Sequence, residues 1–130
     1  MIYKLNKNER QRDHIIFGNH SFEAYMGGVR HFENLSLSKL ERLVEFNFID
    51  LDERQNLAPS VREIYDFMKK YPDYTAHGYT VSIMRDDYRV SLEGVSKSNG
   101  AESAKELEDF AKLFKDADEF DTSPMYCWFD

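Results

Sequence analysis

Cysteine is nearly absent from this 130-residue sequence, which holds a single one, Cys127. One cysteine excludes a disulfide bond within the chain and is typical of proteins from a reducing compartment. Long apolar runs are missing too, because no stretch approaches the roughly 18 residues that a membrane-spanning helix requires. The first residues, MIYKLNKNERQRDHIIFGN, are too polar for a secretory signal peptide. We therefore expect a cytoplasmic protein without membrane contact.

The composition indicates a globular chain. Hydrophobic residues make up 42% of the sequence and aromatic residues 15%, with ten Phe and eight Tyr, which is enough for a dense core and argues against disorder. A chain of this length buries about two thirds of its unfolded surface, so it needs no metal or disulfide to fold. The sequence has no repeat, no low-complexity tract and no long linker. We predict one domain over residues 1–130.

Basic residues are outnumbered, and the charge is unevenly distributed. The net charge is −7. Residues 1–30 hold five Lys/Arg against three Asp/Glu, residues 31–100 hold nine against twelve, and residues 101–130 hold three against nine. An acidic chain repels nucleic-acid phosphates at long range. Nucleic-acid binding would therefore need a local basic surface.

Three helix starts carry the capping-box pattern. In this pattern Ser or Thr is followed three residues later by Glu or Gln, and each side chain accepts a hydrogen bond from the other residue's backbone N–H. The pairs are Ser38–Glu41, Ser60–Glu63 and Ser103–Glu106. Each opens a stripe of apolar residues at helical spacing: Leu40, Leu43, Val44 and Phe48; Val61, Ile64, Tyr65 and Met68; Leu107, Phe110, Ala111, Phe114 and Ala117. We predict that the first helix ends near Asn47, which tolerates a left-handed conformation, and the second before Pro72.

The segment SFEAYMGGVRHF, residues 21–32, fits two structures. Its apolar residues lie at helical spacing and are Phe22, Tyr25, Met26, Val29 and Phe32. Two consecutive glycines, Gly27 and Gly28, would each cost roughly 1 kcal/mol inside a helix. We predict a helix with a close backbone contact at the glycines, and two short extended pieces are the alternative.

The segment HGYTVSIMRDDYRVSLEGV, residues 77–95, predicts a β-hairpin. With Asp86 and Asp87 in a two-residue turn, one face of the hairpin becomes apolar, and the facing pairs are Ile83–Val90 and Val81–Leu92. A four-residue loop is the alternative, because Asp-Asp is not an ideal tight turn. MYCWF, residues 125–129, predicts a short buried strand or an apolar tail packed on the core. The expected fold is α+β, a single compact domain of about four helices packed on a small antiparallel sheet built around the 79–95 hairpin, to which the C-terminal strand adds.

The order helix, helix, helix, hairpin over about residues 21–95 resembles a winged helix-turn-helix domain. The resemblance implies that 60–71 is a recognition helix, that 79–95 is a wing, and that basic side chains of both contact DNA. The basic residues at these places are Arg62, Lys69, Lys70, Arg85 and Arg89. FNFIDLDERQNLAPSVREIYDFM and RDDYRVSLEGV also resemble small uncharacterised proteins carried on bacterial mobile elements, which implies a setting but no mechanism.

No pattern in the sequence predicts a catalytic or metal site. The histidines, at positions 14, 20, 31 and 77, form no pair at metal-ligand spacing. Cys127 lies in the apolar tail, and we interpret it as a packing residue rather than a nucleophile. The acidic segments DLDER and DADEFD lack the Gly and Glu that an EF-hand requires at its sixth and twelfth positions, so we interpret them as solvated turns, with a weak Mg²⁺ or Ca²⁺ site as the alternative. We predict no enzyme activity and no cofactor.

The last predicted helix carries an acidic outward face. Its members are Glu102, Glu106, Glu108, Asp109, Asp116 and Asp118, with three lysines interspersed. A solvated face with i,i+4 ion pairs is the simplest interpretation. The sharper hypothesis, which we favour for function, is an acidic, non-enzymatic protein-interaction protein with an accessory or regulatory role that docks a basic partner on this face. The alternatives are a winged-helix DNA-binding regulator and a DNA mimic that inhibits a nucleic-acid enzyme. Partner identity and oligomeric state stay open.

Overall fold

The computed structural model describes residues 3–20, 25, 27–54 and 57–129. Over these residues the chain forms four α-helices, one short 3₁₀ helix and five β-strands. The helices are α1 (Glu9–Phe17), η1 (Gly18–His20), α2 (Leu37–Glu45), α3 (Val61–Lys70) and α4 (Ala104–Leu113). The strands are β1 (Val29–Leu35), β2 (Thr75–Val81), β3 (Arg89–Lys97), β4 (Glu119–Thr122) and β5 (Met125–Trp128). The α+β class with about four helices was predicted correctly.

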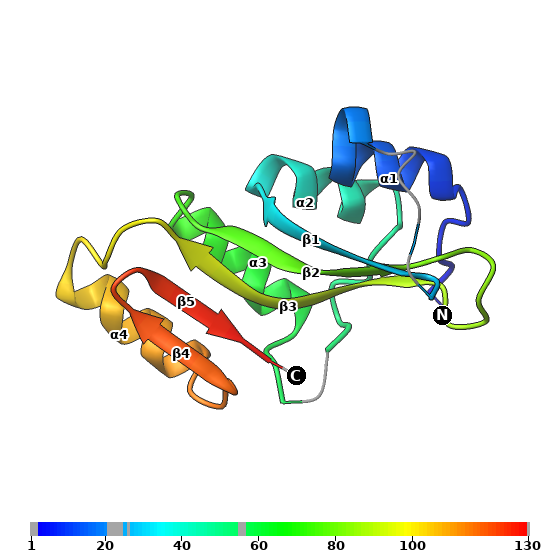
Figure 1. The fold of residues 1–130 in the computed structure, drawn as a ribbon. Coiled ribbons are helices and arrows are strands. Elements are labelled where there is room, and N and C mark those ends of the chain that lie inside the picture. Colours follow the sequence, from blue (N-terminus) through cyan, green and yellow to red (C-terminus); the bar gives the residue numbers. More distant parts are fainter. Residues whose placement is uncertain (1–2, 21–24, 26, 55–56, 130) are drawn as a thin grey trace.

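The strands form one antiparallel sheet in the order β1-β2-β3-β5-β4. The helices lie against one face of this sheet, and the other face carries no helix of the described chain (Figure 1). No helix in the described part of the chain is long and apolar enough to cross a membrane.

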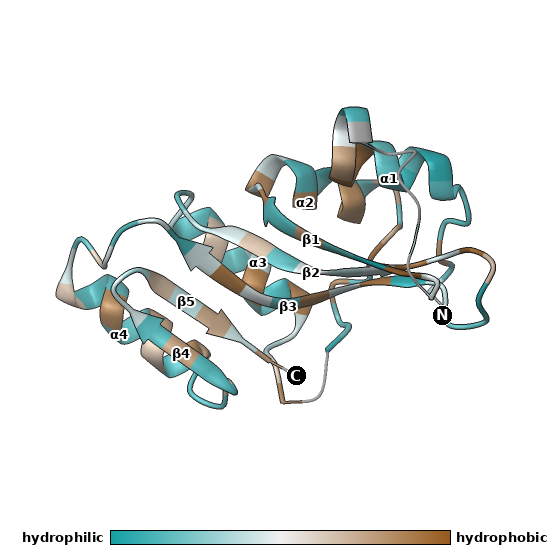
Figure 2. Ribbon diagram, in the orientation of Figure 1, coloured by the Kyte–Doolittle hydropathy of each residue, from teal (hydrophilic) through white to brown (hydrophobic). Residues whose placement is uncertain are grey.

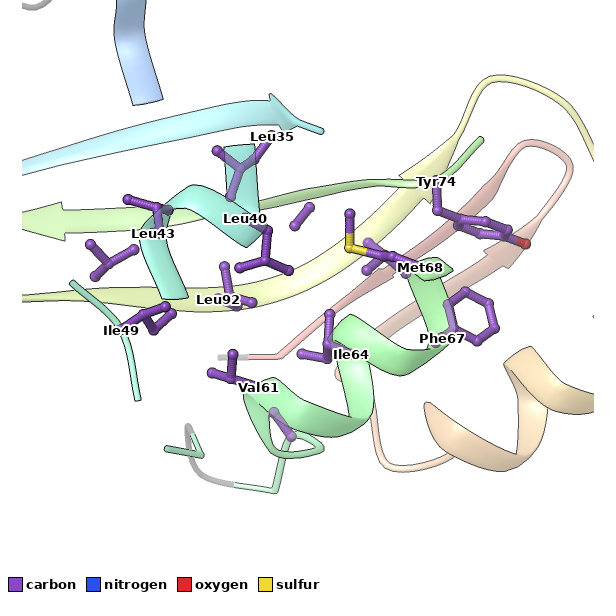
Figure 3. Close-up of a cluster of buried hydrophobic side chains, with 14 of the residues drawn as sticks. Leu35, Leu40, Leu43, Ile49, Val61, Ile64, Phe67, Met68, Tyr74 and Leu92 are labelled. Carbon is purple, nitrogen blue, oxygen red and sulfur yellow. The ribbon is translucent and has the colours of Figure 1, made fainter. Parts of the chain in front are cut away.

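A single hydrophobic core lies between the helices and the sheet. Each helix contributes buried side chains to it, among them Ile15 and Ile16 of α1, Leu40 and Leu43 of α2, Ile64 and Met68 of α3, and Phe110 of α4. The sheet contributes Phe32, Ala76, Val90, Leu92, Val95, Met125 and Cys127. Figure 3 shows part of this core between α2, α3 and the strands. Because each fully buried side chain of this size is worth about 1.5–3 kcal/mol, the core is what holds the helices on this face.

The two edge strands are polar. Figure 2 shows β1 and β4 as largely hydrophilic, in contrast to the apolar stretches of β3 and β5 between them. The sequences VRHFENL and EFDT carry charged residues along both edges. Charged side chains on edge strands discourage pairing with further strands, so the sheet is protected from edge-to-edge aggregation.

The capping prediction is confirmed for α3 and half confirmed for α4. The Ser60 hydroxyl accepts from the Glu63 backbone N–H at 3.2 Å, and the Glu63 carboxylate accepts from the Ser60 N–H at 3.0 Å. Ser103 caps α4 by accepting from the Glu106 N–H at 3.1 Å. The Glu106 carboxylate, however, accepts from the N–H of Glu102 rather than that of Ser103.

The cap predicted for α2 is wrong. Ser36 is the N-cap, and its hydroxyl accepts from the Lys39 N–H at 3.3 Å, while Ser38 lies in the first helical turn. Starting the helix at Leu37 lets that side chain pack against the core, which the Ser38 pattern alone does not show. The predicted helix end is confirmed, because Asn47 adopts a left-handed conformation with φ of 63°.

The helix predicted over 21–32 is wrong where the structure describes it. Residues 29–32 belong to β1, which pairs with β2, and Gly27 and Gly28 have positive φ values in a turn. Residues 21–24 and 26 lie outside the described residues. The apolar spacing was misleading because Val29 pairs with Val81 and Phe32 pairs with Gly78, contacts that are distant in sequence.

The fourth helix is instead α1, which the sequence analysis did not predict. Its buried residues include Arg12 and Asp13 beside Ile15 and Ile16. Two buried charged residues remove the apolar stripe by which an amphipathic helix is recognised.

The β2–β3 hairpin forms the centre of the sheet, as predicted, but its turn and register were predicted wrongly. The connection covers residues 82–88, longer than the two-residue turn or the four-residue loop. The observed pairs are Val81–Arg89, Thr80–Val90 and Gly78–Leu92. Contacts from outside the hairpin fix this end, because Arg12 donates to the Val81 carbonyl at 2.9 Å and the Tyr88 hydroxyl donates to the Asn6 carbonyl at 2.9 Å.

The C-terminal segment is a strand, as one of the two predicted alternatives stated. β5 pairs with β3 through Ser96–Tyr126 and Lys97–Met125. It also pairs with β4, which the sequence analysis interpreted as part of an acidic turn. In the last predicted helix, Phe110 and Phe114 are buried, whereas Leu107 is 42% exposed and does not belong to the core stripe.

Candidate binding site on the open sheet face

The face of the sheet opposite the helices is defined by the strand register. Residues directly opposite one another on paired strands point to the same side. The pairs His31–Tyr79, Tyr79–Ser91, Ser96–Tyr126, Asp121–Tyr126 and Glu119–Trp128 all belong to this side. We call it the open face. Apart from the pair Val29–Val81 at one end, the side chains paired on it are polar or aromatic, whereas the core face is mainly apolar.

A recess of about 540 Å³ lies on the open face, and we call it the β5 recess. The side chains important for its chemistry are His31, Glu33, His77, Glu93, Tyr126 and Trp128. They come from β1, β2, β3 and β5, so the sheet register brings together residues almost a hundred positions apart. Aromatic rings and carboxylates in one recess are groups that recognise cations.

The His77 and Tyr126 rings stack in the β5 recess. Their centroids are 5.2 Å apart and their planes differ by 10°. Within the described residues the His77 Nε2 atom is buried without a hydrogen-bond partner. Burial lowers the pKa of His77, and the Cys127 carbonyl and Glu33 act in the opposite direction. The imidazole is therefore mainly neutral at pH 7 and behaves as a flat packing surface under Tyr126.

Gly94 makes room for this stack. It pairs with His77 on the open face, and a Cβ atom at this position would lie 2.7 Å from His77 Nε2 and would collide with the Cys127 carbonyl. Any larger residue would therefore displace the imidazole or β5. The glycine therefore leaves the space that the His77 ring occupies in its stack with Tyr126.

Carboxylates converge on Tyr126. Burial raises the pKa of the Tyr126 hydroxyl, and the negative charges of Glu119, Glu33 and Glu93 raise it further. Glu93 is buried, and its Oε1 atom lies 3.8 Å from His31 Nδ1, whereas Glu33 and Glu119 are exposed. The β5 recess therefore brings carboxylates close to an aromatic ring.

The opposite end of the open face holds an arginine. The Arg89 guanidinium lies over the Tyr79 ring, 5.4 Å from its centroid, and donates to the Tyr79 hydroxyl at 2.8 Å. It also pairs with the Asp87 carboxylate at 3.1 Å. The open face thus already holds one guanidinium between an aromatic ring and a carboxylate.

The structure does not gather the five predicted DNA-contact residues on one surface. Lys69 and Lys70 end α3 just before β2, whereas Arg85 and Arg89 follow its far end (Figure 1). The 7 residues of β2 span about 20 Å. Each basic residue also has a partner within the chain: Arg62 with Asp52, Lys69 with the Tyr65 ring, Lys70 with Asp109, and Arg85 and Arg89 with Asp87. Their DNA-binding role stays a prediction.

The predicted acidic docking face is only partly at the surface. Glu102, Glu108, Asp116 and Asp118 are exposed. Glu106 is 4% exposed, and the prediction that it points outward is wrong, because its carboxylate pairs with Lys97 at 2.7 Å and accepts from the Tyr74 hydroxyl at 2.8 Å. Asp109 is engaged by Lys70 and Tyr71, and these hydrogen bonds hold its pKa well below its usual range. Docking by the exposed members stays a prediction.

The sequence predicts that Cys127 is a packing residue. Cys127 is fully buried, and burial raises the pKa of its thiol to about 12. Among the described residues, no group of three His, Cys, Asp or Glu side chains is arranged to hold a metal ion.

The residues of the β5 recess were not predicted from the sequence. His31, His77 and Tyr126 belong to no motif, and their proximity depends on strand register. The available signal was alternation, because His31 and Glu33 flank the buried Phe32 on one strand. Comparison with protein-family models, with curated proteins and with solved structures finds no match to this chain.

Proposed function

We propose that this chain is a non-enzymatic interaction protein that docks a basic protein partner on the open face of its sheet. The observation that carries the proposal is the combination of aromatic rings and carboxylates in the β5 recess. An uncovered face alone would not suffice, since antiparallel sheets often expose one face to water. Tyrosine and tryptophan are enriched in protein interfaces, and both stand on this face at Tyr126 and Trp128.

Charge supports a basic partner. The open face carries the carboxylates of Glu33, Glu119 and Asp121 around Tyr126, within a chain of net charge −7. Complementary charge steers association and excludes partners of the same sign.

Capture from a lysate of the native host with matched charge-reversal variants tests the proposal. The open-face variant combines Glu33→Lys with Glu119→Lys, and the helix variant combines Glu108→Lys with Asp116→Lys, so both change the net charge equally. We expect a basic protein to be retained by the wild type and the helix variant, and to be lost from the open-face variant and at high salt.

Two outcomes would overturn the proposal. One is the absence of any salt-sensitive partner. The other is a partner that the open-face variant retains and the helix variant loses, which would place the docking site on the acidic face of α4. If the partner were a nucleic-acid enzyme from which DNA displaces this protein, the DNA-mimic hypothesis would replace the proposal.

A further inference from the structure

The aromatic side chains of the β5 recess are arranged as in a binding site for one flat cationic group. Tyr126 and Trp128 alternate on β5 and so stand on the same face, roughly 6–7 Å apart along the strand. His77 stacks on one face of the Tyr126 ring, so a flat ligand that stacks on Tyr126 would take the opposite face. Both aromatic residues are only half-buried, so a ligand can reach them.

The charge around the recess calls for a cation. None of the residues described as lining it is Lys or Arg, whereas Glu33 and Glu93 are among them. Glu119 adds a third carboxylate from β4, opposite Trp128. A cation beside Tyr126 would be attracted by these carboxylates and by the faces of the rings.

A guanidinium fits this arrangement better than an ammonium. It is planar, stacks on aromatic rings, and presents a fork of N–H donors that matches a carboxylate, whereas an ammonium is a strongly hydrated point charge. The chain itself holds the Arg89 guanidinium on the same face beside the Tyr79 ring, where it donates to the Tyr79 hydroxyl and pairs with Asp87. Two further guanidinium groups, those of Arg12 and Arg30, lie over the rings of Tyr88 and Phe17.

Resting on the proposed function, we infer that the β5 recess binds an arginine side chain of the partner protein, stacked on Tyr126 beside Trp128 and paired with the carboxylate of Glu33. This arginine supplies the partner's specificity, and the surrounding carboxylates supply general attraction to a basic surface. A partner that offers lysine at the same place binds more weakly, because it loses both the stacking and the paired hydrogen bonds.

Trp128 gives a direct signal from the site, because it is the single tryptophan of the chain. The intact protein is titrated with hexa-arginine, hexalysine and hexacitrulline peptides while Trp128 fluorescence is recorded. Citrulline keeps the shape of arginine without its charge. We expect a saturable change with hexa-arginine, binding several-fold weaker with hexalysine, and no saturation with hexacitrulline.

Matched variants locate the binding. Glu33→Gln removes one exposed charge from the recess and is expected to weaken hexa-arginine binding about two- to fivefold. Glu108→Gln removes one exposed charge from the outer side of α4 and is expected to leave binding unchanged. Tyr126→Leu removes the stacking surface, so the preference for arginine over lysine should disappear; if this variant does not fold, the two glutamate variants still decide.

The inference fails if Trp128 does not respond to hexa-arginine, if hexalysine binds equally well, or if both glutamate variants behave alike. Its failure is distinguishable from that of the proposed function. If a host partner is lost from the open-face variant but hexa-arginine causes no change at Trp128, the proposed function is supported and the arginine site is not. If hexa-arginine changes Trp128 fluorescence but no host partner is captured, the arginine site is supported and the proposed function is not.

Discussion

At the scale of single residues, Lys97 and Glu106 form a buried ion pair that joins α4 to β3. Both side chains are 5% exposed and their charged atoms lie 2.7 Å apart. The Tyr74 hydroxyl and the Glu102 N–H also donate to the carboxylate. Burial alone would raise the pKa of Glu106, but the hydrogen bonds from Lys97, Glu102 and Tyr74 outweigh it and hold the pKa below its usual range.

Replacing Lys97 by Met should destabilise the fold by about 3–5 kcal/mol, because it leaves a buried carboxylate without its cation. The pH dependence follows from the sign of the shift. In the wild type, the stabilisation by Glu106 is complete above the unfolded pKa of about 4.3 and is lost as the pH falls through the lower folded value. In the variant, protonation relieves the unpaired charge, so its deficit relative to the wild type should shrink from about pH 7 to about pH 4. Urea unfolding at both pH values measures this.

Lys105→Met is the matched control. Lys105 pairs with Asp109 at 3.2 Å, but its side chain is 63% exposed, so the loss should be at most about 1 kcal/mol at either pH. Equal losses for the two lysine variants would contradict the assignment of Lys97 and Glu106 as a buried, stabilising pair.

Arg12 shows why some residues cannot be placed from the sequence. It is fully buried, and its guanidinium donates to Asp13 at 2.9 Å and to the Val81 carbonyl at 2.9 Å while lying over the Tyr88 ring. An arginine within ERQRDHIIF resembles any exposed helical residue. Asp13 is its neighbour in the sequence, but the Val81 carbonyl and the Tyr88 ring come from far along the chain, and only the tertiary structure brings them to the buried guanidinium.

At the scale of elements, the sequence pattern and the structure place the N-cap of α2 at different residues, Ser38 and Ser36. Ser36→Ala should cost about 1 kcal/mol, because the hydroxyl that accepts from the Lys39 N–H is lost. Ser38→Ala should change stability by less than about 0.5 kcal/mol, since Ser38 is exposed in the first turn, where alanine is a good helix former. Urea midpoints of the two variants measure the difference. A larger loss for Ser38→Ala would restore the capping box predicted from the sequence.

The elements that were predicted are those whose signals are local. The α3 capping box, the end of α2 near Asn47 and the alternating strands of the central hairpin depend on neighbours within a few residues. The elements that were missed depend on distant partners: α1 on the acceptors of Arg12, β1 on pairing with β2, and β4 on pairing with β5. A local pattern therefore predicts a helix incorrectly where pairing with a distant strand stabilises a β-strand instead.

The candidate site was beyond the sequence for the same reason. His77 and Tyr126 stack only because β3 lies between their strands and pairs with both, and because Gly94 on β3 leaves room for the imidazole. A shift of register by one residue would turn Tyr126 toward the core. The acidic residues of the last helix were easy to find in the sequence, but which of them face solvent depends on Lys97 and Lys70.

At the scale of the whole molecule, basic groups are engaged within the chain while the open face is acidic. Lys70, Arg85 and Arg89 pair with carboxylates of the same chain. Burial tends to raise the pKa of Asp87, but the hydrogen bonds from Arg89 and Arg85 lower it. With a net charge of −7, the outer field of the protein repels phosphates and attracts cations.

DNA binding by the winged-helix residues should therefore be negligible, and fluorescence anisotropy of a random-sequence duplex at about 50 and 200 mM salt measures it. We expect no binding at either salt concentration, because phosphate contacts would require Lys70, Arg85 and Arg89 to leave their carboxylates. Asp87→Asn removes the negative charge that pairs with both Arg85 and Arg89 and is the comparison variant. If internal pairing masks these arginines, weak and salt-sensitive binding should emerge in this variant alone. Binding by the wild type that collapses between the two salt concentrations would instead support the winged-helix regulator and make Lys69 and Lys70 the next residues to replace.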